Sequence, residues 1–408
     1  MPSSKRRLSL LIESDRGQAW IGQFSNNDRL TAQKLLGCLT LVSHSAYERA
    51  LTKLIESEAT SSCGPIALYA TREADQHESF FDIDNPIDAV GRGSDIGSEA
   101  RVAALIRNLA RANPSKYLNH PTLQEMKDVR CRSIYVVDDI IGSGKRTYEF
   151  LSSMWHCSTI RSWHSFGLID FKAIAYAATD FGINKLRTSK TKPYIVTFSD
   201  CPTINDMPWT DNVTSDVIQL CRLYGKKTSN KKMALGFKST AATIIFEHGA
   251  PNNSPAILWA PKKNTNWFPL FPDRSVLPSE ASAFPHELQK RDLGEIFNDL
   301  GDHKVAASIG VPHKNLLSST VLAILALLRA DKKSRALISY ATGMPKIECG
   351  NILTWCVEQN FITRNLSLTP LGRAELESAG RAAAWKKTIP IRGDDSYYPQ
   401  QLRRPVGG

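Results

Sequence analysis

The 408-residue sequence predicts an α/β protein built on a parallel sheet, followed by a separate, smaller helical domain. Two short apolar runs, Ile66–Ala70 and Ser133–Val137, have the composition of strands buried on both faces, which is typical of parallel sheets. Between them, Glu99–Ala112 has the spacing of an amphipathic helix. From Thr320 onward the chain changes to short apolar helices, which indicates a second domain.

Spacing and composition also predict elements along the rest of the first domain. Leucines recur at helical intervals in residues 1–60, and the acidic, glycine-rich residues 74–97 predict a mobile loop. Further strands are predicted at Phe166–Ile169, Tyr194–Phe198 and Thr243–Phe246.

Bulk properties favour a cytoplasmic protein with a polyanionic partner. No apolar stretch is long enough to span a membrane, and the N-terminus lacks the pattern of a secretory signal. The eight cysteines are scattered without a C-x-x-C pair, which favours a reducing compartment. The formal charge is +11, and basic residues outnumber acidic ones in residues 316–408, so we expect contact with nucleic acid through the C-terminal region.

The segment VDDIIGSGKR, residues 137–146, carries the most specific functional signal. A predicted strand ends in two acids, and a glycine turn then leads into a predicted helix at Thr147–Met154. Carboxylates accept the two hydrogen bonds that a sugar diol donates, and a glycine turn before a helix binds phosphate through backbone N–H groups. The segment therefore predicts a site for a ribose that carries a 5′-phosphate.

Spacing excludes two commoner phosphate loops. A Walker A loop needs a glycine where Asp139 stands, and the dinucleotide fingerprint needs one at Thr147. The remaining alternative is an ordinary turn between strand and helix in which the two acids occur by chance.

The segment resembles the phosphoribosyl diphosphate (PRPP) signature of type I phosphoribosyltransferases. The resemblance implies a type I phosphoribosyltransferase-like parallel-sheet domain. It implies that Asp138 and Asp139 bind the ribose hydroxyls, and that Mg²⁺ is bound through the phosphates of the ligand. The 5′-phosphate would lie against Gly142, Ser143, Gly144, Lys145, Arg146 and Thr147. One position departs from the signature, because its final threonine is Arg146 here.

Glycosyl transfer from PRPP also needs groups that hold pyrophosphate. Arg72 follows the Ile66–Ala70 strand and is the first candidate, with a surface ion pair to Glu73 or Glu99 as the alternative. Arg92 lies in the predicted loop and could reach the pyrophosphate when that loop closes.

The acceptor is assigned to the segment EHGAPNN after the strand at Thr243–Phe246. His248 is a candidate catalytic base or orienting group, beside Asp138 and Asp139, while Asn252 and Asn253 can read a nucleobase edge. Trp259 and Trp267 nearby suggest a base-stacking pocket. The alternative is a turn whose asparagines bond their own backbone.

The C-terminal pattern resembles a winged helix: helices at 321–328, 334–342 and 346–359, a hairpin at 361–368, and a helix at 369–379. Lys346, on the expected recognition helix, and Arg364, near the wing, are the candidate nucleic-acid contacts. Ile352 and Trp355 are assigned to the core. A winged helix used only for protein contacts is the alternative. The expected domains are 1–275 for the phosphoribosyltransferase-like part, 276–318 for a helical connector, 319–380 for the winged helix and 381–408 for a basic tail.

Three motifs extend the resemblance to most of the chain: VDDIIGSGK at 137–145, FEHGAPNN at 246–253 with LW at 258–259, and YYPQQLR at 397–403. Together they resemble the phosphoribosyltransferase-like effectors of bacterial conflict and antiphage loci, some of which accompany retron reverse transcriptases. This resemblance implies an effector that transfers a phosphoribosyl group or cleaves a nucleotide. Its implied controlling partner is a reverse transcriptase with its RNA–DNA hybrid.

Two other functions stay open. A phosphoribosyltransferase-like fold joined to a winged helix also resembles purine-type repressors, which bind PRPP without catalysis and regulate DNA binding. The third possibility is a scaffold that binds nucleic acid through Lys185–Lys192, Arg222–Lys232 and the winged helix.

Overall fold

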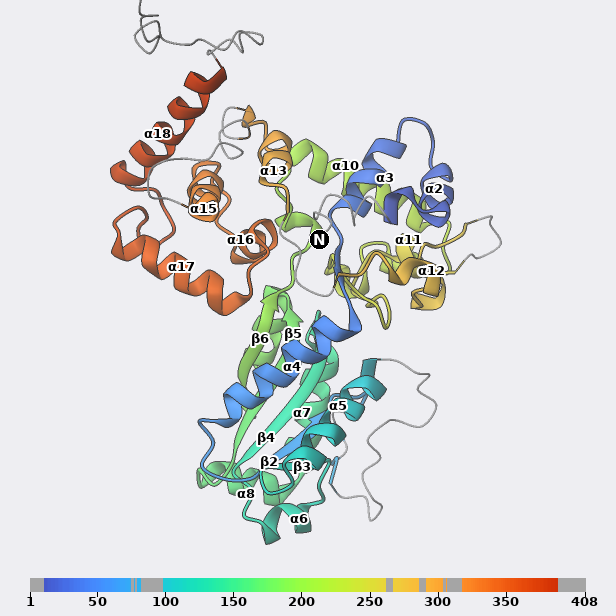
Figure 1. Ribbon diagram of the computed structural model, residues 1–408. Helices are drawn as coiled ribbons and strands as arrows, with labels where there is room; N and C mark the ends of the chain where they lie inside the picture. Colours follow the sequence, from blue (N-terminus) through green and yellow to red (C-terminus); the bar gives the residue numbers. More distant parts are fainter. Residues whose placement is uncertain are drawn as a thin grey trace, which may run out of the picture.

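The structure, a computed structural model, describes residues 11–74, 77, 79–81, 98–261, 267–285, 291–303, 306 and 318–387. Figure 1 shows a sheet domain in the lower half, with two helical bodies above it. Within the described part of the chain, none of the helices combines the length and hydropathy needed to cross a bilayer.

The main sheet has five strands in the order β3-β2-β4-β5-β6, and every pairing is parallel. This confirms the predicted α/β class. Both β2 and β4 are buried along their whole length, as expected from the apolar run of β2 and the apolar first half of β4. The strands are β2 Ile66–Ala70, β3 Tyr117–Asn119, β4 Ser133–Ile141, β5 Asp170–Ala178 and β6 Tyr194–Asp200.

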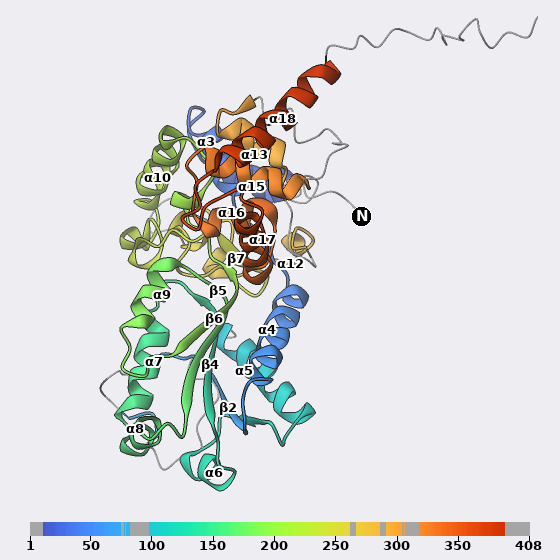
Figure 2. The ribbon, with the colours of Figure 1, turned by 90° about the vertical axis from the view of Figure 1, so that its left-hand side faces the viewer.

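Helices cover both faces of this sheet (Figure 2). Alternate residues of β4 point to opposite faces, so Tyr135 and Val137 pack with one helical layer, and Ile134 and Val136 with the other. The first layer holds α4 His44–Ala59 and α5 Ser98–Ala112. The second holds α6 Leu123–Asp128, α7 Lys145–His156, α8 Ser158–Ser165 and α9 Asp180–Arg187.

A second hydrophobic core lies above the carboxyl ends of the strands. Trp20, Phe24, Tyr224 and Trp267 form its aromatic centre, with ring centroids 4.5 to 6.3 Å apart. Its elements are α2 Asp15–Gly22, α3 Arg29–Gly37, α10 Asp211–Gly225 and α11 Ala256–Trp259, with α12 Pro278–Ala281 beyond. Short 3-10 turns join them: η1 Ile204–Asp206, η2 Lys231–Met233, η3 Phe237–Ser239 and η4 Pro272–Arg274.

A separate two-stranded parallel sheet links this body to the main sheet domain. It pairs β1 Thr40–Val42 with β7 Ile244–Phe246, which are about two hundred residues apart in the sequence. The strand at β7 is as predicted. The N-terminal region is otherwise mostly helical, as its leucine spacing predicts, and the three residues of β1 form a strand through their distant partner.

The C-terminal helices form a third core, as the winged-helix pattern predicts. Ser334 caps α16 as expected, and Gly343 ends it in a left-handed conformation. A single antiparallel bridge, Ile362 to Leu368, forms the expected hairpin. The helices are α15 Ser319–Arg329, α16 Arg335–Thr342, α17 Lys346–Glu358 and α18 Pro370–Lys387, preceded by α13 Leu293–Asp299.

Several predicted boundaries are wrong. β4 continues through Ile141, so the two acids lie inside the strand, where pairing with β5 extends beyond the apolar run. Phe166–Ile169 is a turn rather than a strand, and Phe166 is exposed. Helix α18 runs past residue 380 into the expected tail. Trp355 is 39% exposed, so it is not a core residue.

The winged helix docks on the edge strand β6 through polar contacts. Lys346 Nζ lies 3.1 Å from Asp200 Oδ1 and donates to Thr197 Oγ1 at 3.3 Å. Ser334 Oγ donates to Asp206 Oδ1 at 2.9 Å. In this arrangement the ammonium group of Lys346 holds the two domains together, and its expected contact with nucleic acid stays a prediction.

Replacing Lys346 by alanine should loosen this docking without unfolding either domain. The pair is partly exposed, so we expect a loss of stability of about 1 kcal/mol or less. Hydrogen exchange should become faster at the start of α17 and the end of β6. Lys333→Ala is the control, since Lys333 pairs only locally, with Asp331. Unchanged exchange in Lys346→Ala would show that this ion pair does not hold the interface.

Candidate functional site

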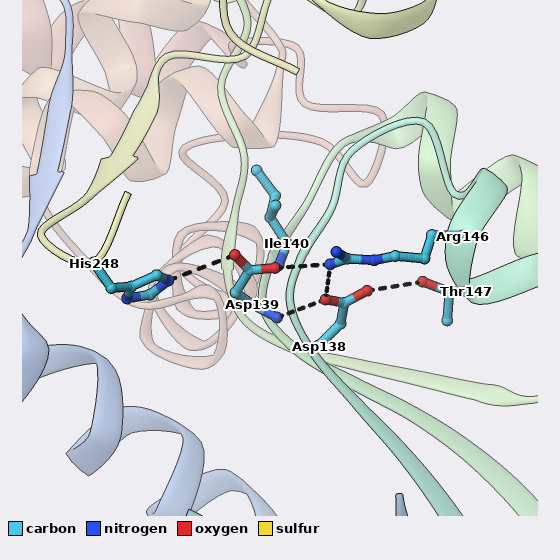
Figure 3. Close-up of polar contacts among 6 residues, drawn as sticks. All are labelled: Asp138, Asp139, Ile140, Arg146, Thr147 and His248. Carbon is cyan, nitrogen blue, oxygen red and sulfur yellow. Dashed lines mark hydrogen bonds and ion pairs between the residues drawn. The ribbon is translucent and has the colours of Figure 1, made fainter. Parts of the chain in front are cut away.

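The two predicted acids lie buried near the carboxyl end of β4 (Figure 3). Asp138 Oδ1 accepts a hydrogen bond from the N–H of Asp139 at 2.9 Å. Asp139 Oδ1 accepts one from the N–H of Ile140 at 2.8 Å. These backbone bonds fix both carboxylates at the edge of the sheet where ligands of open α/β folds bind.

The first turn of α7 supplies further partners for the acids. Arg146 Nη2 donates to Asp138 Oδ1, and also to Asp139 Oδ1 at 3.1 Å. Thr147 Oγ1 donates to Asp138 Oδ2 at 3.2 Å. The arginine that departs from the PRPP signature therefore contacts the carboxylates assigned to ribose.

Arg146 carries one positive charge, which can neutralise only one of the two buried carboxylates. The two carboxyl groups therefore have different pKa values. Burial raises the pKa of Asp138 to about 8; Arg146 opposes the rise and the charge of Asp139 adds to it. Burial acts in the same direction on Asp139, but the His248 ring 3.6 Å away and the charge of Arg146 outweigh it and lower its pKa. The pair with Arg146 therefore holds one proton at neutral pH.

The predicted phosphate turn precedes α7 directly. Gly144 takes the N-cap position with φ of 68°, a conformation that favours glycine. Lys145 N–H donates to Ser143 Oγ at 3.3 Å, and the other N–H groups of the first turn have no intrahelical acceptor. Backbone donors at a helix N-terminus make this turn suitable for a phosphate.

Close backbone contacts hold the turn in place. Thr179 Oγ1 donates to Gly142 O at 2.6 Å and accepts from Gly182 N at 3.0 Å. A Cβ on Gly182 would lie 2.4 Å from Ile141 O and 2.6 Å from Gly142 O. The start of α9 therefore packs directly on the turn through glycine.

Gly182→Ala should displace the phosphate turn, because both clashing atoms belong to the backbone. We expect a destabilisation of about 1–3 kcal/mol and weaker binding of phosphorylated ligands. Thermal unfolding and ligand titration measure the two effects. Gly22→Ala is the control, since a Cβ there meets nothing within 4 Å. A Gly182→Ala variant that matches the control in both measurements would show that this contact is not needed.

His248 lies beside the acids, as the sequence predicted. Its side chain is 3% exposed, and Nε2 is 3.6 Å from Asp139 Oδ2, longer than an ordinary hydrogen bond. The ring stacks on Phe246 at 4.9 Å and lies parallel to His44 at 5.9 Å. It is therefore oriented by packing and directed at Asp139.

Residues of α4 complete the site, and no motif in the sequence indicates them. The N–H of His44 donates to Glu247 Oε2 at 2.7 Å, and burial together with the charge of Arg101 lowers the pKa of His44. Tyr47 lies edge-on to His248 at 4.9 Å. These residues come from a helix two hundred positions before His248.

Several buried polar atoms around the acids have no hydrogen-bond partner among the described residues. They are His44 Nδ1, Tyr47 Oη, Thr71 Oγ1 and both ring nitrogens of His248. Thr71 belongs to this group because its N–H donates to Val137 O, next to Asp138. Buried polar groups are normally paired, so this cluster is suited to a polar ligand.

Other predicted residues have different surroundings. Arg72 lies at the end of β2 with its guanidinium 4.8 Å from the ring centre of Phe80. Arg92 falls outside the described residues. Arg364 is exposed in the wing hairpin.

The expected acceptor segment is used mainly for packing. Asn253 is buried, donates from Nδ2 to Thr240 Oγ1 at 3.0 Å, and covers Gly142. Asn252 is half-buried and its carbonyl accepts from Phe237 N at 2.8 Å. Trp259 and Trp267 lie in the second core, so the expected base-stacking pocket is wrong.

A cavity of about 250 Å³ lies at the carboxyl ends of β5 and β6. Its walls include Ala336 of the winged helix. They also include Thr179, which bonds Gly142 of the phosphate turn, and Thr240, which bonds Asn253. Among the described residues there is no group of three or more histidine, cysteine or acidic side chains that could hold a metal. The expected Mg²⁺ concerns an ion carried by the ligand's phosphates and stays a prediction.

The five-stranded parallel sheet, the twin acids and the phosphate turn define a phosphoribosyltransferase-like domain, here joined to a winged helix. A family model described as PRTase-CE matches residues 18–272, and one described as wHTH-PRTase associated matches residues 322–404. The chain belongs to the PRTase-CE family. Comparison with curated proteins and with solved structures gives no match.

Proposed function

We propose that this protein is a phosphoribosyltransferase-like effector of a bacterial antiphage defence system of the retron type. It binds a ribose 5-phosphate group, as PRPP or a nucleotide, and acts by phosphoribosyl transfer or nucleotide cleavage. The observation that carries the proposal is the placement of Asp138 and Asp139, buried near the carboxyl end of β4 beside the phosphate turn. Membership of the PRTase-CE family supports the ligand class.

In the proposed reaction, the acids hold the ribose hydroxyls while backbone N–H groups of the first turn of α7 hold the 5′-phosphate. The bond between C1 of the ribose and its leaving group breaks as positive charge develops on the sugar. The leaving group is pyrophosphate in PRPP or a base in a nucleotide, and an acceptor or water then forms the new bond to C1. Arg72 and Mg²⁺ are proposed to stabilise departing pyrophosphate.

We propose that His248 takes up the proton of the incoming group. Its ring is held between Phe246 and His44 and faces Asp139. A neutral imidazole there can accept the proton that the acceptor or water loses on attack at C1. The fixed ring orientation favours this role, since a general base must be positioned before its basicity matters.

The proposed controlling partner is a reverse transcriptase with its RNA–DNA hybrid, in the cytoplasm. The winged helix gives such a partner a route to the site, because it docks on β6 and lines the cavity beside the phosphate turn. Nucleic acid is proposed to contact the basic C-terminal region, including Arg364 in the wing.

Incubation of the full-length protein with PRPP, Mg²⁺ and a panel of nucleobases tests the enzymatic proposal. Nucleotides, including dinucleotides, serve as alternative substrates. We expect release of pyrophosphate or of a free base, and loss of that product when Asp138 and Asp139 are replaced. Binding without turnover, with or without the candidate partner, would contradict the enzymatic proposal.

The winged helix supports a second candidate, a PRPP-sensing regulator that binds DNA without catalysis. The exposed face of α17 carries no free basic group for this role, since the helix's single basic residue is docked on β6. The exposed residues of the helix are Ile347, Glu348, Asn351, Thr354, Trp355 and Glu358. A regulator would show DNA affinity that shifts with PRPP and no turnover. Absence of such a shift would remove this candidate.

A further inference from the structure

Three of the four carboxylate oxygens of the acid pair already accept hydrogen bonds. Both Oδ1 atoms accept from a backbone N–H and from Arg146 Nη2. Asp138 Oδ2 accepts from Thr147, and Asp139 Oδ2 faces His248 at 3.6 Å. Each Oδ1 atom already accepts two hydrogen bonds, so a diol that uses the Oδ1 atoms can bind only after one protein donor leaves them.

Arg146 is the donor best able to leave. Its side chain is 35% exposed, whereas Thr147 and the side chain of His248 are 2% and 3% exposed. The backbone N–H groups cannot move without breaking the end of β4. Arg146 also lies on the first turn of α7, where the 5′-phosphate is proposed to bind, and a guanidinium group can bind phosphate through two parallel hydrogen bonds.

We propose that Arg146 is a specificity-determining residue that admits ribose to the acid pair only when the sugar carries a 5′-phosphate. The phosphate supplies a second anionic partner for the guanidinium group, which turns from the carboxylates and uncovers them for the diol. A ribose or nucleoside without phosphate offers no such partner, so the ion pair with Asp138 and Asp139 stays closed. This inference rests on the proposed function and gives the position that departs from the PRPP signature a role of its own.

Binding of D-ribose and of ribose 5-phosphate to the full-length protein, each with Mg²⁺, tests the proposal. Calorimetric titration compares the wild type with Arg146→Thr, which introduces the threonine of the signature. Lys145→Thr is the matched control, because it removes a positive charge from the same turn, and that charge pairs with Glu149 rather than with the acids. Thermal unfolding checks each variant, and Arg146→Lys retains the charge in case the threonine variant does not fold.

The wild type should bind ribose 5-phosphate and show little affinity for ribose. In Arg146→Thr the affinity for ribose should rise at least about tenfold and that for ribose 5-phosphate should fall, as expected from charge-assisted hydrogen bonds. Arg146→Lys should lie between the two, because an ammonium group bridges two carboxylates less well than a guanidinium. Lys145→Thr should weaken only the phosphorylated sugar.

Two results would separate the possible failures. If ribose binds equally to the wild type and to Arg146→Thr while ribose 5-phosphate still depends on the acids, the gating role of Arg146 is wrong and the proposed ligand class survives. If the wild type binds neither ribose 5-phosphate nor PRPP, the proposed function itself is wrong, and the gating role of Arg146 is wrong with it.

Discussion

Replacing Asp138 and Asp139 together by asparagine should weaken the binding of PRPP at least about 30-fold, because the pair carries one negative charge, and one charge-assisted hydrogen bond to the ribose of about 1.5–3 kcal/mol and one neutral one of about 0.5–1.5 kcal/mol are lost. Asparagine keeps the shape of each side chain but removes the negative charge and places a donor where an acceptor is needed. Turnover should fall to background for the same reason. Titration with PRPP and a product assay measure the two losses.

The fold should survive this double substitution. Arg146 loses both carboxylate partners, but its partly exposed side chain can turn toward water. A control variant, Asp170→Asn/Asp216→Asn, removes two exposed carboxylates from β5 and α10. It should bind PRPP like the wild type. Full binding by the Asp138→Asn/Asp139→Asn variant, with an intact fold, would contradict the site.

Stability should fall as the pH rises from about 5 to about 8. The folded Asp138 carboxyl has its pKa raised to about 8 by burial, whereas an unfolded aspartate titrates near 3.9. Between these values the folded state holds a proton that the unfolded state has released. The free energy of unfolding therefore decreases with pH in this window, by up to about 1.4 kcal/mol per pH unit.

Asp139 changes the free energy of unfolding with pH in the opposite direction and in a different pH range. Its pKa is lowered in the folded state, so its contribution is present above the unfolded value and is lost only in acid. Denaturant unfolding at several pH values should show this decrease of the free energy of unfolding between about pH 5 and pH 8 in the wild type. The decrease should be clearly smaller in Asp138→Asn, in which Asp139 and Arg146 form a simple ion pair. An equal pH dependence in the two proteins would contradict the proton held by the acid pair.

The sequence predicted those parts of the fold that depend on local pattern. The uninterrupted apolar runs of β2 and β4 identified a buried parallel sheet, and the caps at Ser334 and Gly343 placed α16 correctly. The acids and glycine turn are adjacent in the chain, so their spacing alone indicated a phosphate site. Each of these features is decided by neighbouring residues.

Features that depend on distant partners could not be read from the chain. β1 is a strand only because β7 pairs with it, and His44 and Tyr47 reach His248 from a helix far earlier in the sequence. The ion pair of Lys346 joins it to Asp200, which lies on a strand far earlier in the sequence. In each case the second partner decides the role, and no local pattern names that partner.

The asparagines after β7 illustrate the same limit. Asn253 follows a strand end beside a predicted site, where an amide that reads a base would also stand. Its actual neighbours are Thr240 and Gly142, and a Cβ on Gly142 would lie 2.2 Å from the Asn253 side chain. The absence of a side chain at Gly142 therefore makes room for Asn253, whose side chain packs against the turn.

The structure of the protein with PRPP and Mg²⁺ bound tests the central claim most directly. The account predicts both ribose hydroxyls within hydrogen-bonding distance of Asp138 and Asp139, the 5′-phosphate on the first turn of α7, and Arg146 turned from the acids. PRPP bound elsewhere, for example in the cavity at the ends of β5 and β6, with Arg146 still on both carboxylates, would contradict it.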